Sequence, residues 1–217
     1  MSKGIILISG GLDSLVSLGL GIKQYGITLG LTFDYGQKSA EYEIKASKKI
    51  CDYYKIEHKI INLDWLKSIT HTALVSDKEL PSNINEDSAK AVWVPNRNGL
   101  FLNIAGAIAD GENYDYILIG ANKEEAQTFP DNSEEFIKNV NAEFEYSTQK
   151  HPKVIAPLLN FDKNDIVKLA LENKIPLELV HSCYAGGEKH CGICESCTRL
   201  KNALKNNHDN YYIGKLF

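Results

Sequence analysis

The chain has 217 residues, is 43% hydrophobic and carries a net charge of −4, which suits one α/β domain with a small appendage. The acidic balance and the lack of a basic block argue against a large electrostatic footprint for nucleic acid, so we expect no stable nucleic-acid binding; a local basic patch is the alternative. The sequence shows neither a signal peptide nor an apolar stretch of membrane-spanning length. We therefore expect a cytoplasmic protein with reduced thiols and no membrane contact.

The first apolar run leads into two adjacent glycines. Residues 4–9 predict a buried parallel strand, and residues 13–25 predict an amphipathic helix that Gly26 ends. Gly10 and Gly11 allow a sharp turn and let an anion approach the main-chain N–H groups at the start of the helix. The pattern therefore predicts a phosphate-binding turn.

Asp13 is unusual beside such a turn, because a carboxylate repels phosphate unless a cation lies between them. The turn thus indicates a polyphosphate bound together with Mg²⁺, with the hydroxyl groups of Ser9 and Ser14 as further donors. No lysine follows the glycines, so this is not the loop of the P-loop NTPases. The alternative is an ordinary strand-to-helix turn that Asp13 or Ser14 caps.

The segments that follow alternate between strand and helix patterns, which predicts an α/β fold with an open parallel sheet and helices on both faces. Further strands are expected at residues 27–34, 58–63, 114–120 and 154–158. Further helices are expected at residues 39–54, 98–113, 134–147 and 162–173, the last with Asp162 as N-cap and Asp165 at its third position. Residues 70–95 and 123–133 predict loops. We interpret the first as a flap near the site, with a plain surface excursion as the alternative.

Residues Asp34-Tyr35-Gly36-Gln37 follow the second predicted strand. Ligands of open α/β sheets bind outside the carboxyl ends of the strands, so this tetrapeptide is expected to face the same crevice as the glycine turn. Arg97 stands at the start of a strong helix, shortly after Pro95, and is a candidate phosphate-binding cation.

Four cysteines crowd near the end of the chain with the spacing C-x7-C-x2-C-x2-C: Cys183, Cys191, Cys194 and Cys197. Four thiolates can close a tetrahedron around Zn²⁺, and a closed shell indicates a structural metal. An iron–sulfur cluster is the rival assignment, although the x3-C-P continuation of ferredoxin motifs is missing here. We divide the chain into a main domain at residues 1–175 and a zinc-binding region at residues 176–217 packed on it.

Five residues near these motifs have simpler interpretations. We expect Cys51 to fill the core, and His181 and His190 to lie outside the metal shell because the thiolates complete it. Arg199 and Lys201 could donate hydrogen bonds to the anionic sulfurs or offset their charge.

The string Ser9-Gly10-Gly11-Leu12-Asp13-Ser14 resembles the PP-loop of the ATP pyrophosphatase superfamily, whose members transfer AMP from ATP to a substrate. Three further stretches are similar to the 7-cyano-7-deazaguanine synthase (QueC) family: residues 34–37, residues 94–98 (VPNRN) and the segment from Ser182-Cys183-Tyr184 to the CGICESC run at residues 191–197. This resemblance covers nearly the whole chain.

The resemblance implies an ATP-dependent carbon–nitrogen ligase with a PP-loop, adenine nucleotide hydrolase-like fold. Family members convert 7-carboxy-7-deazaguanine and ammonia to 7-cyano-7-deazaguanine, on the route to queuosine or archaeosine. They are homodimers with one structural zinc per subunit, and they use ATP with Mg²⁺. The alternatives are a related PP-loop ligase that adenylates another carboxylate or a tRNA base for amidation or thiolation, and a nucleotide-binding module without turnover.

On this resemblance, the candidate catalytic residues are Asp13, Arg97 and Lys163. The candidate nucleotide-binding segment comprises Ile8, Ser9, Gly10, Gly11, Leu12, Asp13, Ser14, Leu15, Val16, Ser17 and Leu18. The candidate substrate-binding residues are Tyr35, Gln37, Phe129 and Asp131. For Lys163 the alternative is a solvated lysine in the first turn of a helix, where it opposes the helix dipole. The chain departs from the family pattern in residues 121–136, where the Pro-Asp and Glu-Phe elements remain, and at His181, where the family has tryptophan.

Overall fold

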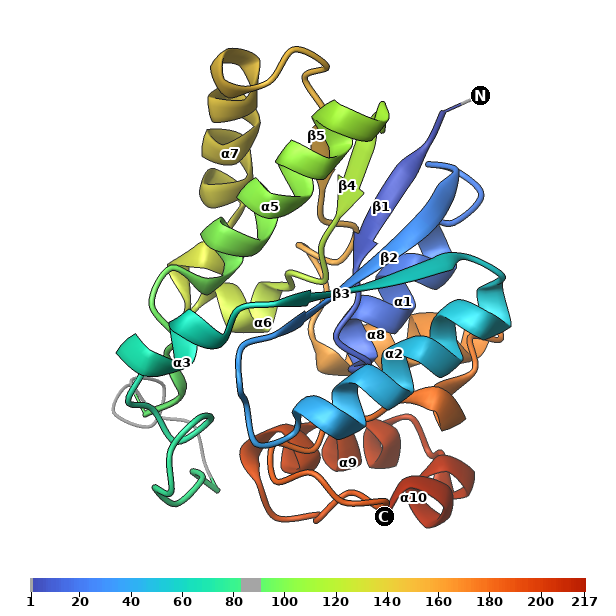
Figure 1. Cartoon of the computed structure of the whole chain (residues 1–217). Helices are drawn as coiled ribbons and strands as arrows, with labels where there is room; N and C mark the ends of the chain where they lie inside the picture. The colour runs from blue at the N-terminus through green and yellow to red at the C-terminus, as the bar shows by residue number, and fades with distance from the viewer. Residues whose placement is uncertain (1, 83–90) are drawn as a thin grey trace.

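The computed structural model describes residues 2–82 and 91–217. Five parallel strands form one sheet in the order β3-β2-β1-β4-β5 (Figure 1). Their bounds are Gly4–Leu7 for β1, Ile27–Asp34 for β2, Glu57–Asn62 for β3, Tyr116–Leu118 for β4 and Lys153–Ile155 for β5. All five correspond to predicted strands, and their pairing confirms the predicted open parallel sheet.

Helices cover both faces of the sheet (Figure 1). One face is covered by α5 (Arg97–Glu112) and α7 (Glu134–Ser147), the other by α1 (Leu12–Gly21), α2 (Ala40–Tyr54) and α8 (Lys163–Glu172). The central strand shows why: Ile5 and Leu7 belong to one buried cluster, and Ile6 and Ile8 belong to the other. Successive side chains of a strand point to opposite faces, so a strand that is apolar at every position must be covered twice.

The C-terminal part adds two helices, α9 (Glu195–Asn206) and α10 (Asn210–Leu216), which lie below α2 and α8 in Figure 1. Leu200, Ala203 and Leu204 of α9 are buried in the same cluster as Ile166 and Val167 of α8. The region after residue 175 therefore shares a hydrophobic core with the sheet. No helix in the described part of the chain combines the length and the apolarity needed to cross a membrane.

Several element boundaries differ from the predictions. The predicted helix 13–25 ends at Gly21, and hydrogen-bonded turns follow, such as the one in which Tyr25 N donates to Gly21 O at 2.9 Å. Gly26 has φ of +57° and makes the turn into β2 instead of ending the helix. The predicted loop at 123–133 holds the short helix α6 (Lys123–Ala126), capped by the Asn122 side chain, and a 3-10 turn at Pro130–Asn132. The N-cap of Asp162 and its reciprocal bond with Asp165 are confirmed.

A short helix, α3 (Asp64–Ile69), precedes the expected flap. Residues 70–82 that follow it are irregular, whereas residues 83–90 of the flap lie outside the described residues. Main-chain bonds tie the described part to the carboxyl side of the sheet, because Lys38 N donates to Leu74 O at 2.8 Å and Glu195 N donates to Pro81 O at 3.1 Å.

Candidate active site

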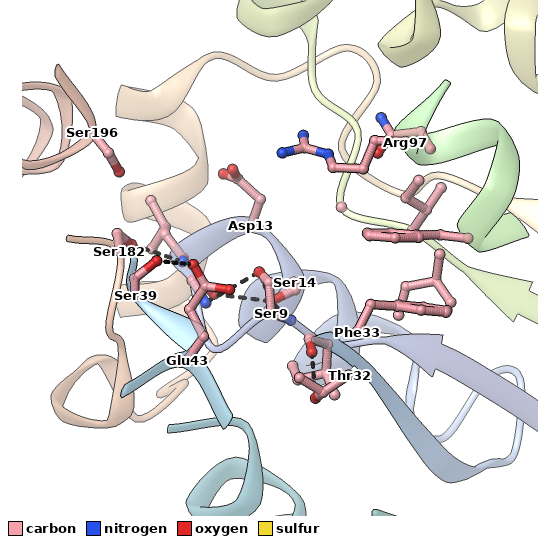
Figure 2. A pocket seen from close by; sticks show the side chains of 18 of the residues that line it. Ser9, Asp13, Ser14, Thr32, Phe33, Ser39, Glu43, Arg97, Ser182 and Ser196 are labelled. Atoms are coloured by element: carbon pink, nitrogen blue, oxygen red, sulfur yellow. Dashed lines mark hydrogen bonds between the residues drawn. The ribbon is translucent and has the colours of Figure 1, made fainter. Parts of the chain in front are cut away.

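A cavity of about 230 Å³ lies at the carboxyl ends of β1, β2 and β4. Its wall includes the three predicted catalytic residues, Asp13, Arg97 and Lys163. They come from the starts of three different helices, α1, α5 and α8. Figure 2 shows the side chains of Asp13 and Arg97 pointing into this space from opposite sides. The topology therefore gathers residues that are up to 150 positions apart in the chain.

The glycine turn places the first amides of α1 on the cavity. Gly10 has φ of +77°, and a Cβ there would lie 2.8 Å from the Cβ of Ala46, so only glycine fits. The first main-chain bond of α1 runs from Leu15 N to Gly11 O at 3.2 Å, which leaves the preceding amides outside the helical ladder. Gly11 is the N-cap, so the alternative in which Asp13 or Ser14 caps the helix is wrong.

Serine hydroxyl groups shape this turn from both sides. Ser14 Oγ donates to Gly11 O at 3.1 Å and accepts from Ser9 N at 3.3 Å. Leu12 N donates to Ser182 Oγ at 3.3 Å, which links the turn to the segment just before the cysteine cluster. Sequence reasoning gave Ser182 no role, although the Ser-Cys-Tyr motif was a signal for it.

The predicted nucleotide-binding segment divides into two parts. Its first part lines the cavity with Ile8, Ser9, Gly11, Leu12, Asp13 and Ser14. Leu15, Val16, Ser17 and Leu18 are fully buried and do not line the cavity. The second part therefore supports the turn from the core.

The buried ammonium group of Lys163 forms ion pairs with two carboxylates. Lys163 Nζ forms ion pairs with Asp13 Oδ2 and with Glu125 Oε1, the latter at 2.9 Å, and its side chain is 13% exposed. Burial raises the pKa of Asp13 to about 6, and Lys163 opposes this only in part. Burial also disfavours ionised Glu125, but Lys163 together with Arg199 and Asn122 outweighs that effect and leaves the pKa of Glu125 lowered. The solvated alternative for Lys163 is thus wrong, and no sequence pattern indicated Glu125.

Asp13 offers a carboxylate oxygen that can serve as a ligand of a divalent cation. Its Oδ1 is buried and has no hydrogen-bond partner within residues 2–82 and 91–217. Burial of an unsatisfied carboxylate oxygen is costly unless a cation or donor meets it. Carboxylate oxygen is also the ligand type that Mg²⁺ prefers, so the residue fits this metal.

Arg97 forms the opposite wall of the cavity. It follows Asn96, which adopts a left-handed φ of +49° and turns the chain into α5. Burial raises the pKa of the Tyr35 hydroxyl, and the guanidinium of Arg97 beside it opposes that shift. Arg97 also attracts the carboxylate of Asp131, whose main-chain carbonyl accepts from Asn98 Nδ2 at 3.2 Å.

The Gln37 side chain is occupied in the turn after β2. Its Oε1 accepts from Tyr35 N at 3.0 Å, and its Nε2 donates to Phe33 O at 3.2 Å and to Glu43 Oε2 at 2.8 Å. Tyr35 and Gln37 both line the cavity, as expected for the DYGQ segment. The bonds of Gln37 hold the loop that carries Tyr35.

A smaller cavity of about 50 Å³ adjoins the first and shares Arg97, Glu125 and Tyr184 with it. Phe129 and Asp131, two predicted substrate-binding residues, line only the smaller cavity. Its remaining lining includes the side chains of Trp93, Glu195 and Arg199. Trp93 and Phe129 stack with ring centroids 6.0 Å apart and an interplanar angle of 15°. Sequence reasoning missed Trp93, Tyr184 and Glu195 as site residues.

The four cysteines converge at the N-terminus of α9. Their sulfur atoms all lie within 4.8 Å of one another, and Cys191 Sγ lies 3.8 Å from Cys197 Sγ. A tetrahedral zinc with bonds of about 2.3 Å requires sulfurs roughly 3.8 Å apart, so the donor set fits. Hydrogen bonds from Cys194 and Cys197 lower the pKa of Cys183, which favours a thiolate there. The four sulfur atoms are thus arranged so that they can hold a metal ion.

The other candidates near the cluster have different partners. His190 Nε2 accepts from Ser182 N at 2.9 Å, and its ring stacks on that of His181 at 5.2 Å. Arg199 pairs with Glu124 and Glu195, and Lys201 lies over the Phe217 ring at 5.1 Å. In the part of the chain that the structure describes, these two basic residues thus have carboxylate and aromatic partners in place of hydrogen bonds to sulfur, and the offset of the sulfur charge stays a prediction.

Comparisons with known proteins agree with this geometry. The family model described as queuosine biosynthesis protein QueC matches residues 3–208. The chain is 50% identical over 217 residues to 7-cyano-7-deazaguanine synthase from Methanosarcina mazei, covering 94% of each chain. It is also 50% identical over 215 residues to the synthase from Carboxydothermus hydrogenoformans, covering 95% of this chain and 100% of the relative. The structure of U34-tRNA thiolase NcsA from Methanococcus maripaludis shares the fold, with a TM-score of 0.52 at 19% identity over 99% of this chain and 69% of that chain. The chain belongs to the QueC family of queuosine biosynthesis proteins.

Proposed function

We propose that the chain is an ATP-dependent ligase that converts 7-carboxy-7-deazaguanine and ammonia to 7-cyano-7-deazaguanine. The observation that carries this proposal is the 50% identity to the Methanosarcina mazei synthase over 94% of both chains. The cavity supports it, because a glycine turn, Asp13, Arg97 and Lys163 face one space at the carboxyl edge of the sheet. Family membership favours this substrate over the other carboxylates and tRNA bases that a PP-loop ligase could activate.

The chemistry requires electrostatics and positioning more than a nucleophilic side chain. A carboxylate is a poor electrophile, and transfer of AMP from ATP gives it a leaving group while pyrophosphate departs. Ammonia displaces AMP and leaves an amide. A second adenylation, on the amide oxygen, and loss of AMP and a proton give the nitrile. Each adenylation builds up charge on the departing pyrophosphate, which pre-arranged N–H groups and cations can stabilise.

The position of each residue in the cavity sets its proposed role in this reaction. The amides at the start of α1 would cradle the pyrophosphate, and Lys163 and Arg97 would neutralise its charge from two sides. Mg²⁺ bound by Asp13 would supply further charge neutralisation on the polyphosphate. Asp13 and Glu125 hold Lys163 in the cavity before the nucleotide binds. We assign Tyr35, Gln37, Phe129 and Asp131 to the substrate side, with Gln37 acting through the loop that it holds.

We propose that the metal of the four cysteines is zinc and that its role is structural. Cys194 and Cys197 bracket the first turn of α9, and Ser196 and Leu200 of that helix line the larger cavity. A closed thiolate shell would fix this helix against the site without binding substrate. On this view residues 176–217 form an appendage that completes the main domain at residues 1–175. We further propose a cytoplasmic homodimer, which light scattering of the purified protein would test.

The test is a reaction of the purified chain with 7-carboxy-7-deazaguanine, ammonium and MgATP, analysed by mass spectrometry. We expect the nitrile, with two AMP and two pyrophosphate released for each nitrile formed. Asp13→Asn should keep the fold and lose most turnover, because it removes the charge at the cation position. Absence of AMP release with this acid would rule out the proposed substrate, and unchanged turnover of Asp13→Asn would show that Asp13 binds no cation.

A further inference from the structure

Glu195 is a buried carboxylate that neither the nucleotide site nor the metal site uses. It is the first residue of α9, between Cys194 and Cys197, and it is 5% exposed. Its main chain is fixed, because Glu195 N donates to Pro81 O at 3.1 Å. Its side chain lines the smaller cavity. Acidic residues are almost never this buried without a specific partner.

The two carboxylate oxygens of Glu195 have different environments. Oε2 accepts from the Tyr184 hydroxyl at 3.1 Å. Oε1 contacts Arg199 Nε as an ion pair, but it is buried and accepts no hydrogen bond from any residue that the structure describes. An ionised carboxylate has acceptor sites for about four hydrogen bonds. Arg199 lies against Oε1, and acceptor capacity of the carboxylate is left over for a ligand.

The surroundings of Glu195 fit the edge of a flat ring. The stacked side chains of Trp93 and Phe129 lie on the wall of the same small cavity. At about 50 Å³ this cavity holds a ring edge, while the shared residues Arg97, Glu125 and Tyr184 connect it to the larger cavity. A bicyclic ligand can thus lie across both spaces, with its far end among Asp13 and Lys163.

We propose that Glu195 recognises the pyrimidinone edge of a guanine-type ring, by accepting hydrogen bonds from its N1–H and its 2-amino group. This inference rests on the proposed function. In 7-carboxy-7-deazaguanine these two donors lie opposite the carboxyl-bearing five-membered ring, so binding them at Glu195 directs the carboxyl group toward the phosphate-binding turn. A buried acceptor discriminates strongly, because an analogue that lacks a donor leaves it unpaired.

The first test uses the wild-type enzyme and a matched pair of substrates. The analogue is 7-carboxy-7-deazahypoxanthine, which lacks only the 2-amino group. We expect its kcat/KM to be lower by about 5- to 150-fold than that of 7-carboxy-7-deazaguanine, as for a buried acceptor that is left without its donor. Equal kcat/KM values for both acids would overturn the inference. Nitrile formation from 7-carboxy-7-deazaguanine itself tests the proposed function separately.

The second test asks whether Glu195 causes this preference. Glu195→Gln should reduce the ratio of the two kcat/KM values to within about threefold, while KM for ATP and the bound metal stay unchanged. Glu188→Gln, in the exposed part of the same cysteine segment, is the control and should keep the wild-type ratio. If Glu195→Gln does not fold, Glu195→Asp replaces it, since the shorter carboxylate should lower the ratio as well. A wild-type ratio in either metal-loaded variant would overturn the assignment.

Discussion

The phosphate end of the cavity is one continuous stretch, Ser9 to Ser14, together with Lys163, whereas the ring end around the smaller cavity comes from several separated segments. Those segments include Trp93, the pair Phe129 and Asp131, Tyr184, and Glu195 with Arg199. At the phosphate end the proposed contacts are main-chain amides, whose position follows from Gly10 and the start of α1. At the ring end the proposed contacts are side chains.

Because of this difference, the two ends of the cavity should be sensitive to different substitutions. Main-chain amides at a helix start persist as long as the helix does, so the phosphate end depends on the core of the sheet. The ring end depends on α9, and two of the four cysteines, Cys194 and Cys197, lie on either side of the first turn of this helix. We therefore expect variants to impair one end of the cavity without the other.

Loss of a cysteine should have the largest effect, because a structural metal contributes folding energy directly. Cys194→Ala should bind less than a tenth of the wild-type metal, as zinc sites need about four ligands. It should also unfold at lower denaturant and lose nitrile synthesis. Cys51→Ala is the control, since Cys51 belongs to α2 and is buried in the core, so its loss should leave the metal content unchanged. Metal analysis and urea unfolding decide, and full metal retention by Cys194→Ala would remove that residue from the shell.

The phosphate end should be most sensitive at Lys163. Lys163→Met leaves Asp13 and Glu125 facing each other without their cation and removes a charge from the pyrophosphate site. We expect kcat to fall by about 10²- to 10³-fold, as when one pre-arranged electrostatic group is lost. Lys168→Met on the same helix, where the side chain is 66% exposed, should leave kcat unchanged. A loss of less than threefold in Lys163→Met would assign Lys163 a structural role.

The same contrast explains what the amino-acid sequence could predict. All five strands and the glycine turn follow from local rules, because apolar runs and paired glycines act over a few residues. The ring end does not follow from local rules. No residue near Glu195 in the sequence indicates that its helix faces the cavity, and the spacing of the neighbouring cysteines indicates only a metal site. A signal for α9 existed in Leu200, Ala203 and Leu204, which recur at helical spacing. The early end of α1 at Gly21 had no comparable signal.

The ring end can be tested without touching the metal. Phe129→Ala removes one face of the stacked pair with Trp93. We expect KM for 7-carboxy-7-deazaguanine to rise by about 5- to 100-fold, the usual cost of losing a stacked aromatic partner, with KM for ATP unchanged. Tyr146→Ala, at a side chain that is 93% exposed, is the control. An equal rise in both KM values would show that the two ends of the cavity are one site, against the division argued above.

A small effect is expected from the support behind the glycine turn. Thr32 Oγ1 donates its only proton to Ile8 O at 2.7 Å, so His58 Nε2, 2.8 Å from the same oxygen, must act as donor. Burial lowers the pKa of His58 below its usual value, and nearby Lys48 adds to this. The unfolded chain therefore takes up a proton at a higher pH than the folded chain. Stability from this group is complete above the unfolded pKa of about 6.5 and is lost as pH falls toward the folded pKa.

His58→Gln should remove this acid sensitivity, because the amide can still donate to Thr32 but does not titrate. Between pH 8 and pH 5, the two pH values of the experiment, we expect the wild type to lose more free energy of unfolding than the variant, because the folded state disfavours protonation of His58. Urea unfolding at each pH measures the difference. If the free energy of unfolding depends on pH equally in the wild type and the variant, His58 has the same pKa in the folded and unfolded states. If the variant keeps the wild-type pH dependence of unfolding but turns over more slowly, Thr32 and His58 would act on the phosphate end by holding Ile8 and the turn that follows it.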